Sequence, residues 1–241
     1  MKRLSLYALT ALTRIVADLP LLWMFYFLYF EREGAGGVFD ILSNAVVFVA
    51  FGTLHSLLAR DFAKRYIAQI VGEHYVRAVY VWISAITLSA VLYLWRPISG
   101  TLWQTQGILA WVLSLLYLGC IAGMVWTTFY IDYPEFLGVR TLLHVIRNQP
   151  AQPPVFSVKG PYAYCRHPMY LLLLIALWVG PVMSHTRLEF ALLASPYLLI
   201  GTFLEERNLR EELGEVYELY RANVPMWLPR LTPWKYERPL E

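Results

Sequence analysis

Six stretches of the sequence are apolar over enough residues to form membrane-spanning helices, and this feature constrains the fold more than any other. A helix needs roughly 20 apolar residues to cross a hydrocarbon core of about 30 Å. The predicted spans are Leu4–Phe30, Val38–Leu58, Tyr75–Trp95, Gly107–Tyr130, Met169–Ser184 and Leu188–Leu204. The chain is 58% hydrophobic and 15% charged, whereas soluble domains average about 45–50% and about 25%. We therefore predict an all-α protein, a polytopic membrane bundle of about six transmembrane helices.

The distribution of basic residues predicts how the bundle is oriented. With these spans, most of the 20 lysines and arginines fall on the side that holds both termini, and only a few fall on the other side. Because cytoplasmic loops carry an excess of Lys and Arg, we predict that both termini are cytoplasmic, together with a C-terminal amphipathic helix. The net charge is only +3, which gives no sign of a nucleic-acid partner. The expected partner of the apolar surface is the lipid bilayer.

A polar segment immediately precedes the fifth predicted span. Gly160-Pro161 is a turn signal, and Pro168 suits the first turn of a helix, where its missing N–H costs nothing. Arg166 and His167 would then lie beside free backbone N–H groups at the positive end of the helix dipole, which favours a carboxylate or another anion. The alternative is structural: Arg166 anchors the cytoplasmic side, and His167 caps the helix.

The sixth predicted span leads into a charged amphipathic helix. Leu209, Leu213, Val216 and Tyr220 recur at helical spacing and form one apolar stripe. Glu205 precedes Leu209 by one turn, so we expect its carboxylate on the same face, where burial is costly without a partner. The alternative is a solvated charge cluster at the membrane surface, which explains Glu205 poorly.

The polar motifs of the C-terminal third form an ordered series. Its members are Arg166-His167-Pro168-x-Tyr170, an apolar hairpin, Glu205-Glu206, Leu213-Gly214-Glu215-x-Tyr217, Tyr220, and Val224-Pro225 with Pro229. This series resembles the C-terminal module of isoprenylcysteine carboxyl methyltransferases and phospholipid N-methyltransferases. Nearer the N-terminus, two segments look like parts of bacterial methanethiol S-methyltransferases and of the related NnrU-type membrane proteins. These segments are His55-Ser56-Leu57-Leu58-Ala59-Arg60 and Trp95-Arg96-Pro97-Ile98.

The resemblance implies a methyltransferase that depends on S-adenosyl-L-methionine, in a multi-pass protein of the bacterial inner membrane. It implies about four N-terminal transmembrane helices in residues 1–130 and a methyltransferase module in residues 131–241. The cofactor-binding residues that it implies are Tyr162, His167, Pro168, Met169, Tyr170, Glu205 and Glu206. No metal site is predicted, because His74 and His144 show no ligand spacing to His55.

The expected methyl acceptor is a small thiol such as methanethiol, or another lipophilic molecule. A thiol reacts as its thiolate, so Arg166 is the candidate catalytic residue that favours the anion, and His55 is the candidate substrate residue. For His55 the alternative is a hydrogen-bonded structural role. Where prenylcysteine enzymes carry a substrate arginine, this chain has Gly201, which argues against a prenylcysteine carboxylate.

Three other functions remain open from the sequence. The expected function is that of a small-thiol methyltransferase. The alternatives are an isoprenylcysteine or phospholipid methyltransferase, an accessory membrane protein of the NnrU type, and an NADPH-dependent membrane reductase. A reductase would need a basic group for the 2′-phosphate of its cofactor, and Glu205-Glu206 is unfavourable beside a phosphate. Protection of the protein against heat by S-adenosyl-L-methionine would separate an active binding module from an accessory protein.

Overall fold

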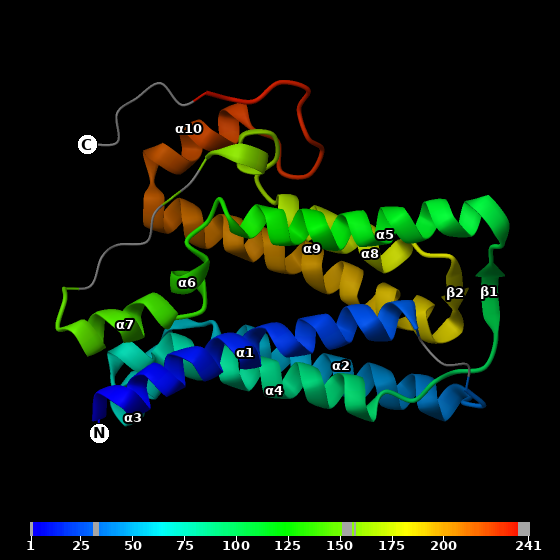
Figure 1. The fold of residues 1–241 in the computed structure, drawn as a ribbon, viewed down its shortest axis with the longest axis horizontal. Helices are drawn as coiled ribbons and strands as arrows, with labels where there is room; N and C mark the ends of the chain where they lie inside the picture. Colours follow the sequence, from blue (N-terminus) through cyan, green and yellow to red (C-terminus); the bar gives the residue numbers. More distant parts are fainter. Residues whose placement is uncertain (1, 31–33, 151–155, 157, 236–241) are drawn as a thin grey trace. The chain divides into compact units, whose positions relative to one another are not determined.

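The computed structural model describes residues 2–30, 34–150, 156 and 158–235. The chain divides into two compact units, which are residues 1–102, 132–154 and 184–187 in the first, and residues 103–131, 155–183 and 188–241 in the second. The regular structure of the described residues is almost entirely helical, as Figure 1 shows. Two short strands, β1 (Thr101–Gln104) and β2 (Val182–Ser184), form a two-stranded sheet. The prediction of an all-α fold is confirmed.

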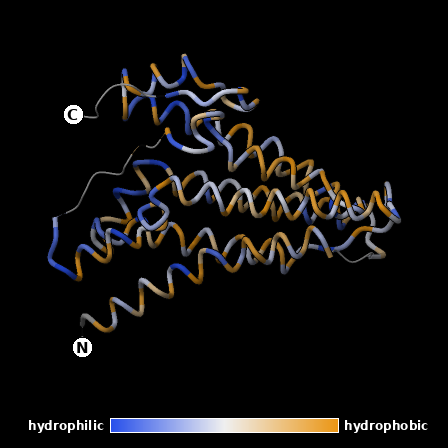
Figure 2. The backbone as a smooth tube through the Cα atoms, turned by 45° about the horizontal axis from the view of Figure 1, so that its top comes forward, coloured by the Kyte–Doolittle hydropathy of each residue, from blue (hydrophilic) through white to orange (hydrophobic). Residues whose placement is uncertain are grey.

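Five helices of the described chain are long and apolar enough to cross a membrane. They cover Leu4–Tyr29, Val38–Leu58, Glu73–Leu94, Gly107–Thr128 and His185–Leu213, and Figure 2 shows long orange, hydrophobic stretches along them. A shorter apolar helix, α8 (Pro168–Trp178), accompanies them. Together these helices confirm a polytopic membrane bundle.

The fifth predicted span, Met169–Ser184, differs from the helix that forms there. Helix α8 has 11 residues, so it is about 16 Å long, roughly half the thickness of the hydrocarbon core. It ends at Trp178, shortly before Gly180-Pro181, because proline disfavours the helical conformation in the residue before it. The chain then continues as β2 rather than as helix.

The first unit is a set of packed apolar helices. It contains α1 (Lys2–Tyr29), α2 (Val38–Leu58), α3 (Asp61–Val71), η1 (Glu73–Tyr75), α4 (Val76–Leu94), α6 (Tyr133–Phe136) and α7 (Val139–Arg147). Helices α1 and α2 pack against α4. The Nε1 of Trp82 donates to Oγ1 of Thr13 at 2.9 Å, and the Asn44 amide exchanges two hydrogen bonds with the backbone of Arg96. Such bonds join helices where a bilayer offers no hydrophobic driving force between them.

The second unit contains the polar C-terminal motifs. Its helices are α5 (Gly107–Thr128), η2 (Gly160–Ala163), α8, most of α9 (His185–Leu213) and α10 (Glu215–Asn223). Helix α5 packs along α8. At their contact, a Cβ added to Gly123 would lie 2.9 Å from the side chain of Leu172. The glycine therefore allows the two helices to approach closely.

Helix α9 carries both the last span and the first turns of the charged region. It runs for 29 residues in spite of Pro196, and Gly214, with a φ of +56°, separates it from α10. This glycine changes the register of the apolar stripe. Tyr217 is 1% exposed, whereas Val216 is 37% exposed, so the predicted place of Val216 on the buried stripe is wrong.

Candidate functional site

The polar loop in front of α8 is joined to the segment that follows α10. Four backbone hydrogen bonds of 2.9–3.3 Å connect them: Arg166 N to Pro225 O, His167 N to Met226 O, Arg230 N to Tyr164 O, and Trp234 N to Ala163 O. The thiol of Cys165 donates to the carbonyls of Met226 and Trp227, and burial raises the pKa of this thiol. The C-terminal segment therefore holds the loop that carries Arg166 and His167.

Gly160 allows the backbone at the start of the loop before α8 to pass close to the ring of Tyr130. Gly160 has a φ of +57°, and a Cβ there would lie 2.4 Å from the ring of Tyr130. The turn that follows, η2, carries Tyr162, whose carbonyl accepts a hydrogen bond from the Tyr220 hydroxyl at 2.6 Å. Burial raises the pKa of Tyr162 to about 12. Its hydroxyl is therefore protonated at neutral pH.

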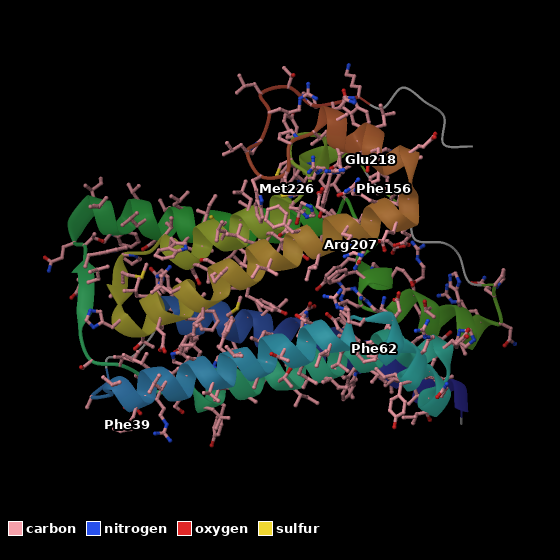
Figure 3. All side chains as sticks on the ribbon, turned by 180° about the vertical axis from the view of Figure 1, so that it is seen from behind. Phe39, Phe62, Phe156, Arg207, Glu218 and Met226 are labelled. Atoms are coloured by element: carbon pink, nitrogen blue, oxygen red, sulfur yellow. The ribbon has the colours of Figure 1, made fainter. Side chains whose placement is uncertain are left out.

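Aromatic packing fixes α10 beside this loop. Tyr217, Tyr220 and Val224 form a buried cluster. The ring of Phe156 lies 5.9 Å from that of Tyr217 and 5.4 Å from that of Tyr220, and Figure 3 labels Phe156 and Met226 near α10. Edge contacts of this kind add to the stabilisation from burial, so the two tyrosine hydroxyls are held in place.

The centre of the site is the buried carboxylate of Glu206. Its Oε1 accepts hydrogen bonds from Nε of Arg166 at 2.8 Å, from Nε2 of His167 at 2.7 Å and from the Tyr217 hydroxyl at 2.8 Å. Its Oε2 accepts from Nη2 of Arg166 at 2.9 Å and lies 3.2 Å from Nε of Arg221. Burial of a carboxylate is costly unless it is paired and hydrogen-bonded, and here both conditions are met. Burial and the neighbouring Glu206 raise the pKa of Tyr217.

All three nitrogens of the Arg166 guanidinium make hydrogen bonds in this cluster. Besides its two bonds to Glu206, its Nη1 donates to the carbonyls of Arg221 at 3.2 Å and Val224 at 2.6 Å. A guanidinium has five N–H groups, and these contacts use most of them. These contacts join the guanidinium of Arg166, the candidate catalytic residue, to Glu206 and to the backbone of Arg221 and Val224. Because the guanidinium is engaged, it offers little to the anion expected at this place.

His167 connects the buried cluster to the accessible part of the site. Its ring is 6% exposed and stacks on Tyr170 with the centroids 5.7 Å apart. Its Nδ1 lies 3.9 Å from Oε2 of Glu205. Pro168 is the first residue of α8 and is buried, and Met169 follows it, half-buried. The second unit thus brings all seven predicted cofactor residues into the loop, the first turn of α8 and the end of α9.

The two neighbouring glutamates differ strongly in exposure. Sequence spacing placed Glu205 on the buried face, yet its side chain is 42% exposed, whereas that of Glu206 is 6% exposed. The expectation for Glu205 is therefore wrong, because the face that α9 buries here contains Glu206. Glu205 is the carboxylate that remains accessible to a ligand.

His55 belongs to the first unit, where it lies within α2. Its Nδ1 lies 3.0 Å from Oγ of Ser84, and its Nε2 lies 2.7 Å from the hydroxyl of Tyr80. Oγ of Ser84 donates its own proton to the Tyr80 carbonyl, so it accepts from Nδ1–H, and Nε2 accepts from the Tyr80 hydroxyl. Within the described residues, no group of three or more His, Cys, Asp or Glu side chains is arranged to hold a metal ion.

Sequence reasoning missed two partners of Glu206, Tyr217 and Arg221. Tyr217 follows Glu206 by 11 residues, which on a continuous helix would separate the two by about 16 Å along the axis. Tyr217 and Arg221 both lie on α10 and reach Glu206 only because the chain breaks at Gly214. Helical spacing alone does not predict either contact.

Known proteins resemble this chain over most of its length. A methanethiol S-methyltransferase of Pseudomonas deceptionensis is 38% identical over 82% of this chain and 76% of its own length. One from Mycobacterium tuberculosis is 32% identical over 78% of each chain, and Nurim of Danio rerio is 25% identical over 73% of this chain and 68% of its own. No model of a protein family and no solved structure matches the chain. With these identities and this coverage, the chain belongs to the family of methanethiol S-methyltransferases.

Proposed function

We propose that the protein is an integral-membrane methyltransferase that transfers a methyl group from S-adenosyl-L-methionine to methanethiol or a similar small thiol. The observation that carries this proposal is the identity of 38% over 82% of the chain with a methanethiol S-methyltransferase. The buried cluster around Glu206 supports it, because it holds the accessible Glu205 carboxylate and the His167 imidazole beside the apolar helices α8 and α9. Methylation of methanethiol yields dimethyl sulfide.

The residues at the site fit this cofactor. When bound, S-adenosyl-L-methionine supplies a methyl group activated by a positively charged sulfonium, so the chemistry belongs to the cofactor. Glu205 and Nδ1 of His167 offer hydrogen-bond acceptors, which suit the hydroxyl and ammonium groups of such a ligand. The rings of Tyr162 and Tyr170 offer aromatic faces, which attract a cation by about 0.5–2 kcal/mol. Pro168 and Met169 complete the surface that would hold it.

Glu206 and Arg166 have a different part in the proposal. Both side chains are nearly buried, with 6% and 7% exposed, and each is occupied by the other. They hold the loop in front of α8 and the end of α9 in one arrangement. This preorganisation lets the accessible residues align the reacting groups and exclude water.

The acceptor is proposed to be handled by the N-terminal spans. Every residue assigned to the cofactor lies in residues 131–241, and the candidate substrate residue His55 lies in residues 1–130. There the Tyr80 hydroxyl and the His55 ring form a polar pair within apolar helices. A small thiol is apolar enough to enter through the bilayer, whereas the polar cofactor enters from the side of the termini, which we propose is the cytoplasm.

Thermal stability of the detergent-purified protein tests the cofactor. S-adenosyl-L-methionine and S-adenosylhomocysteine should raise the melting temperature, and NADPH should not. A ligand that binds only the folded state adds about 2.7 kcal/mol at a hundredfold excess over its Kd. The shift should vanish in Glu205→Ala and persist in Glu212→Ala, a matched variant of an exposed carboxylate on the same helix.

The acceptor is tested by headspace detection of dimethyl sulfide from methanethiol in the presence of the cofactor. Product formed by the wild type but not by Glu205→Ala supports the proposal. A thermal shift with NADPH alone would contradict the assignment of the cofactor. A shift with the adenosyl ligands without dimethyl sulfide would retain the cofactor and exclude methanethiol as the acceptor.

A further inference from the structure

We propose that Glu206 is a positioning residue that holds His167 in a single tautomer and thereby gives the site an edge made only of hydrogen-bond acceptors. The edge consists of Nδ1 of His167 and the carboxylate of Glu205. It selects the parts of a ligand that donate hydrogen bonds, namely an ammonium group or ribose hydroxyls. The identity of the ligand rests on the proposed function; the tautomer does not.

The carboxylate of Glu206 is ionised in this cluster. Two arginines lie within 3.2 Å of it, and the Tyr217 hydroxyl donates to it at 2.8 Å. A protonated carboxyl would place a donor against these donors and leave the buried guanidinium of Arg166 without its counter-ion. An ionised carboxylate accepts hydrogen bonds and donates none.

The tautomer of His167 follows from this charge. Nε2 of His167 lies 2.7 Å from Oε1 of Glu206, so Nε2 must carry the proton of that hydrogen bond. In the neutral ring, Nδ1 then has a lone pair and no proton. Nδ1 lies 3.9 Å from Oε2 of the Glu205 carboxylate.

The ring cannot easily turn to exchange its two nitrogens. One face of His167 stacks on Tyr170 with an angle of 3° between the planes, and the Trp227 ring lies 6.3 Å away. The backbone N–H of His167 donates to the Met226 carbonyl. Rotation would break the bond to Glu206 and leave part of a buried carboxylate without its donor, which is costly.

Two acceptors at this separation require a donor from the ligand. A neutral Nδ1 and an ionised Glu205 cannot bond to each other, whereas one ammonium group or a pair of hydroxyls can satisfy both. A carboxylate of the ligand would be repelled by Glu205 and find no donor on Nδ1. The edge therefore favours a hydrogen-bond donor, whereas the N-terminus of α8 suggested an anion.

The tautomer is measured directly by NMR of protein labelled with ¹⁵N in its histidine rings. Nitrogen shifts distinguish N–H from unprotonated ring nitrogens, and comparison with His167→Gln assigns the signals. We expect His167 in the wild type to carry its proton on Nε2, and Glu206→Gln to lose this fixed state because an amide can donate or accept. A wild-type signal showing the proton on Nδ1 would overturn the proposal without any variant.

Binding calorimetry tests the selectivity of the edge. The probes are S-adenosylhomocysteine, its analogue without the amino group, and its analogue without the ribose hydroxyls. A site built to bond a donor rejects the analogue that lacks it, so at least one analogue should bind the wild type about tenfold more weakly or worse. That loss should shrink in Glu206→Gln and stay unchanged in Glu212→Gln.

The outcomes separate this proposal from the proposed function. If His167 has the expected tautomer but no adenosyl compound binds, the positioning role stands and the cofactor is wrong. If S-adenosylhomocysteine binds and both analogues bind equally well, the acceptor edge is refuted while the cofactor stands. If Glu206→Gln fails to fold, the wild-type tautomer and the two analogues still decide the question.

Discussion

Replacing Tyr217 with phenylalanine removes one hydroxyl from the Glu206 cluster and leaves the buried ring in place. The hydroxyl donates to Oε1 of Glu206 at 2.8 Å, and the residue is 1% exposed. Hydrogen bonds to charged groups contribute about 1.5–3 kcal/mol. We expect Tyr217→Phe to lower the free energy of unfolding by this amount, because Arg166 and His167 still bond to the carboxylate and the packing is conserved.

The matched control is Tyr220→Phe, one turn away in the same cluster. Its hydroxyl donates to the neutral carbonyl of Tyr162 at 2.6 Å, and a neutral hydrogen bond contributes about 0.5–1.5 kcal/mol. Both variants remove the same atom from a buried tyrosine. The charge on the acceptor is therefore the main difference between them.

Denaturant titration of the detergent-solubilised protein, followed by tryptophan fluorescence, measures both losses. The double variant Tyr217→Phe/Glu206→Gln should lose less than the sum of the single variants, because contacting residues are coupled. If Tyr217→Phe costs no more than Tyr220→Phe, or if the double variant is additive, then Glu206 is not the charged acceptor that organises the site.

Three further predictions concern other parts of the chain. Gly160→Ala should destabilise the protein by about 1–3 kcal/mol, because the φ of Gly160 is +57° and the new Cβ would meet the ring of Tyr130. The control is Gly119→Ala, whose Cβ would have nothing within 4 Å. Thermal unfolding measures the stability of both variants. Burial raises the pKa of Tyr162 to about 12. The stability that the protonated Tyr162 contributes is therefore complete below about pH 10 and lost as the pH rises through about 12. Unfolding measured against pH should follow this loss in parallel with the absorbance of tyrosinate. His55→Gln should raise KM for methanethiol and leave calorimetric binding of S-adenosylhomocysteine unchanged; weaker binding of that ligand would refute the assignment.

The sequence was sufficient for the membrane fold because each long span is a continuous apolar run. The sequence does mark the end of α8 with Gly180-Pro181, but the apolar composition continues past this signal, so hydropathy alone places the end of the span too late. The sequence could not decide between Glu205 and Glu206, because one residue of helix rotation, about 100°, exchanges the buried and exposed positions. What decides is the position of Tyr217 and Arg221 after the break at Gly214. The sequence motifs identify the residues of the site as a group. Which of these residues are buried and which are accessible depends on the tertiary contacts.

The dependence of the loop before α8 on the segment after α10 also sets the order of events during synthesis. Arg166 is translated 40 residues before Glu206 and 58 residues before Val224. At about 5–20 residues per second, it waits about 3–12 s for the last of these partners. The long spans are already synthesised by then, so a nascent chain can be inserted in the membrane and still lack the site. Ribosomes that stop after α9 would therefore release an inserted protein that cannot bind its ligand.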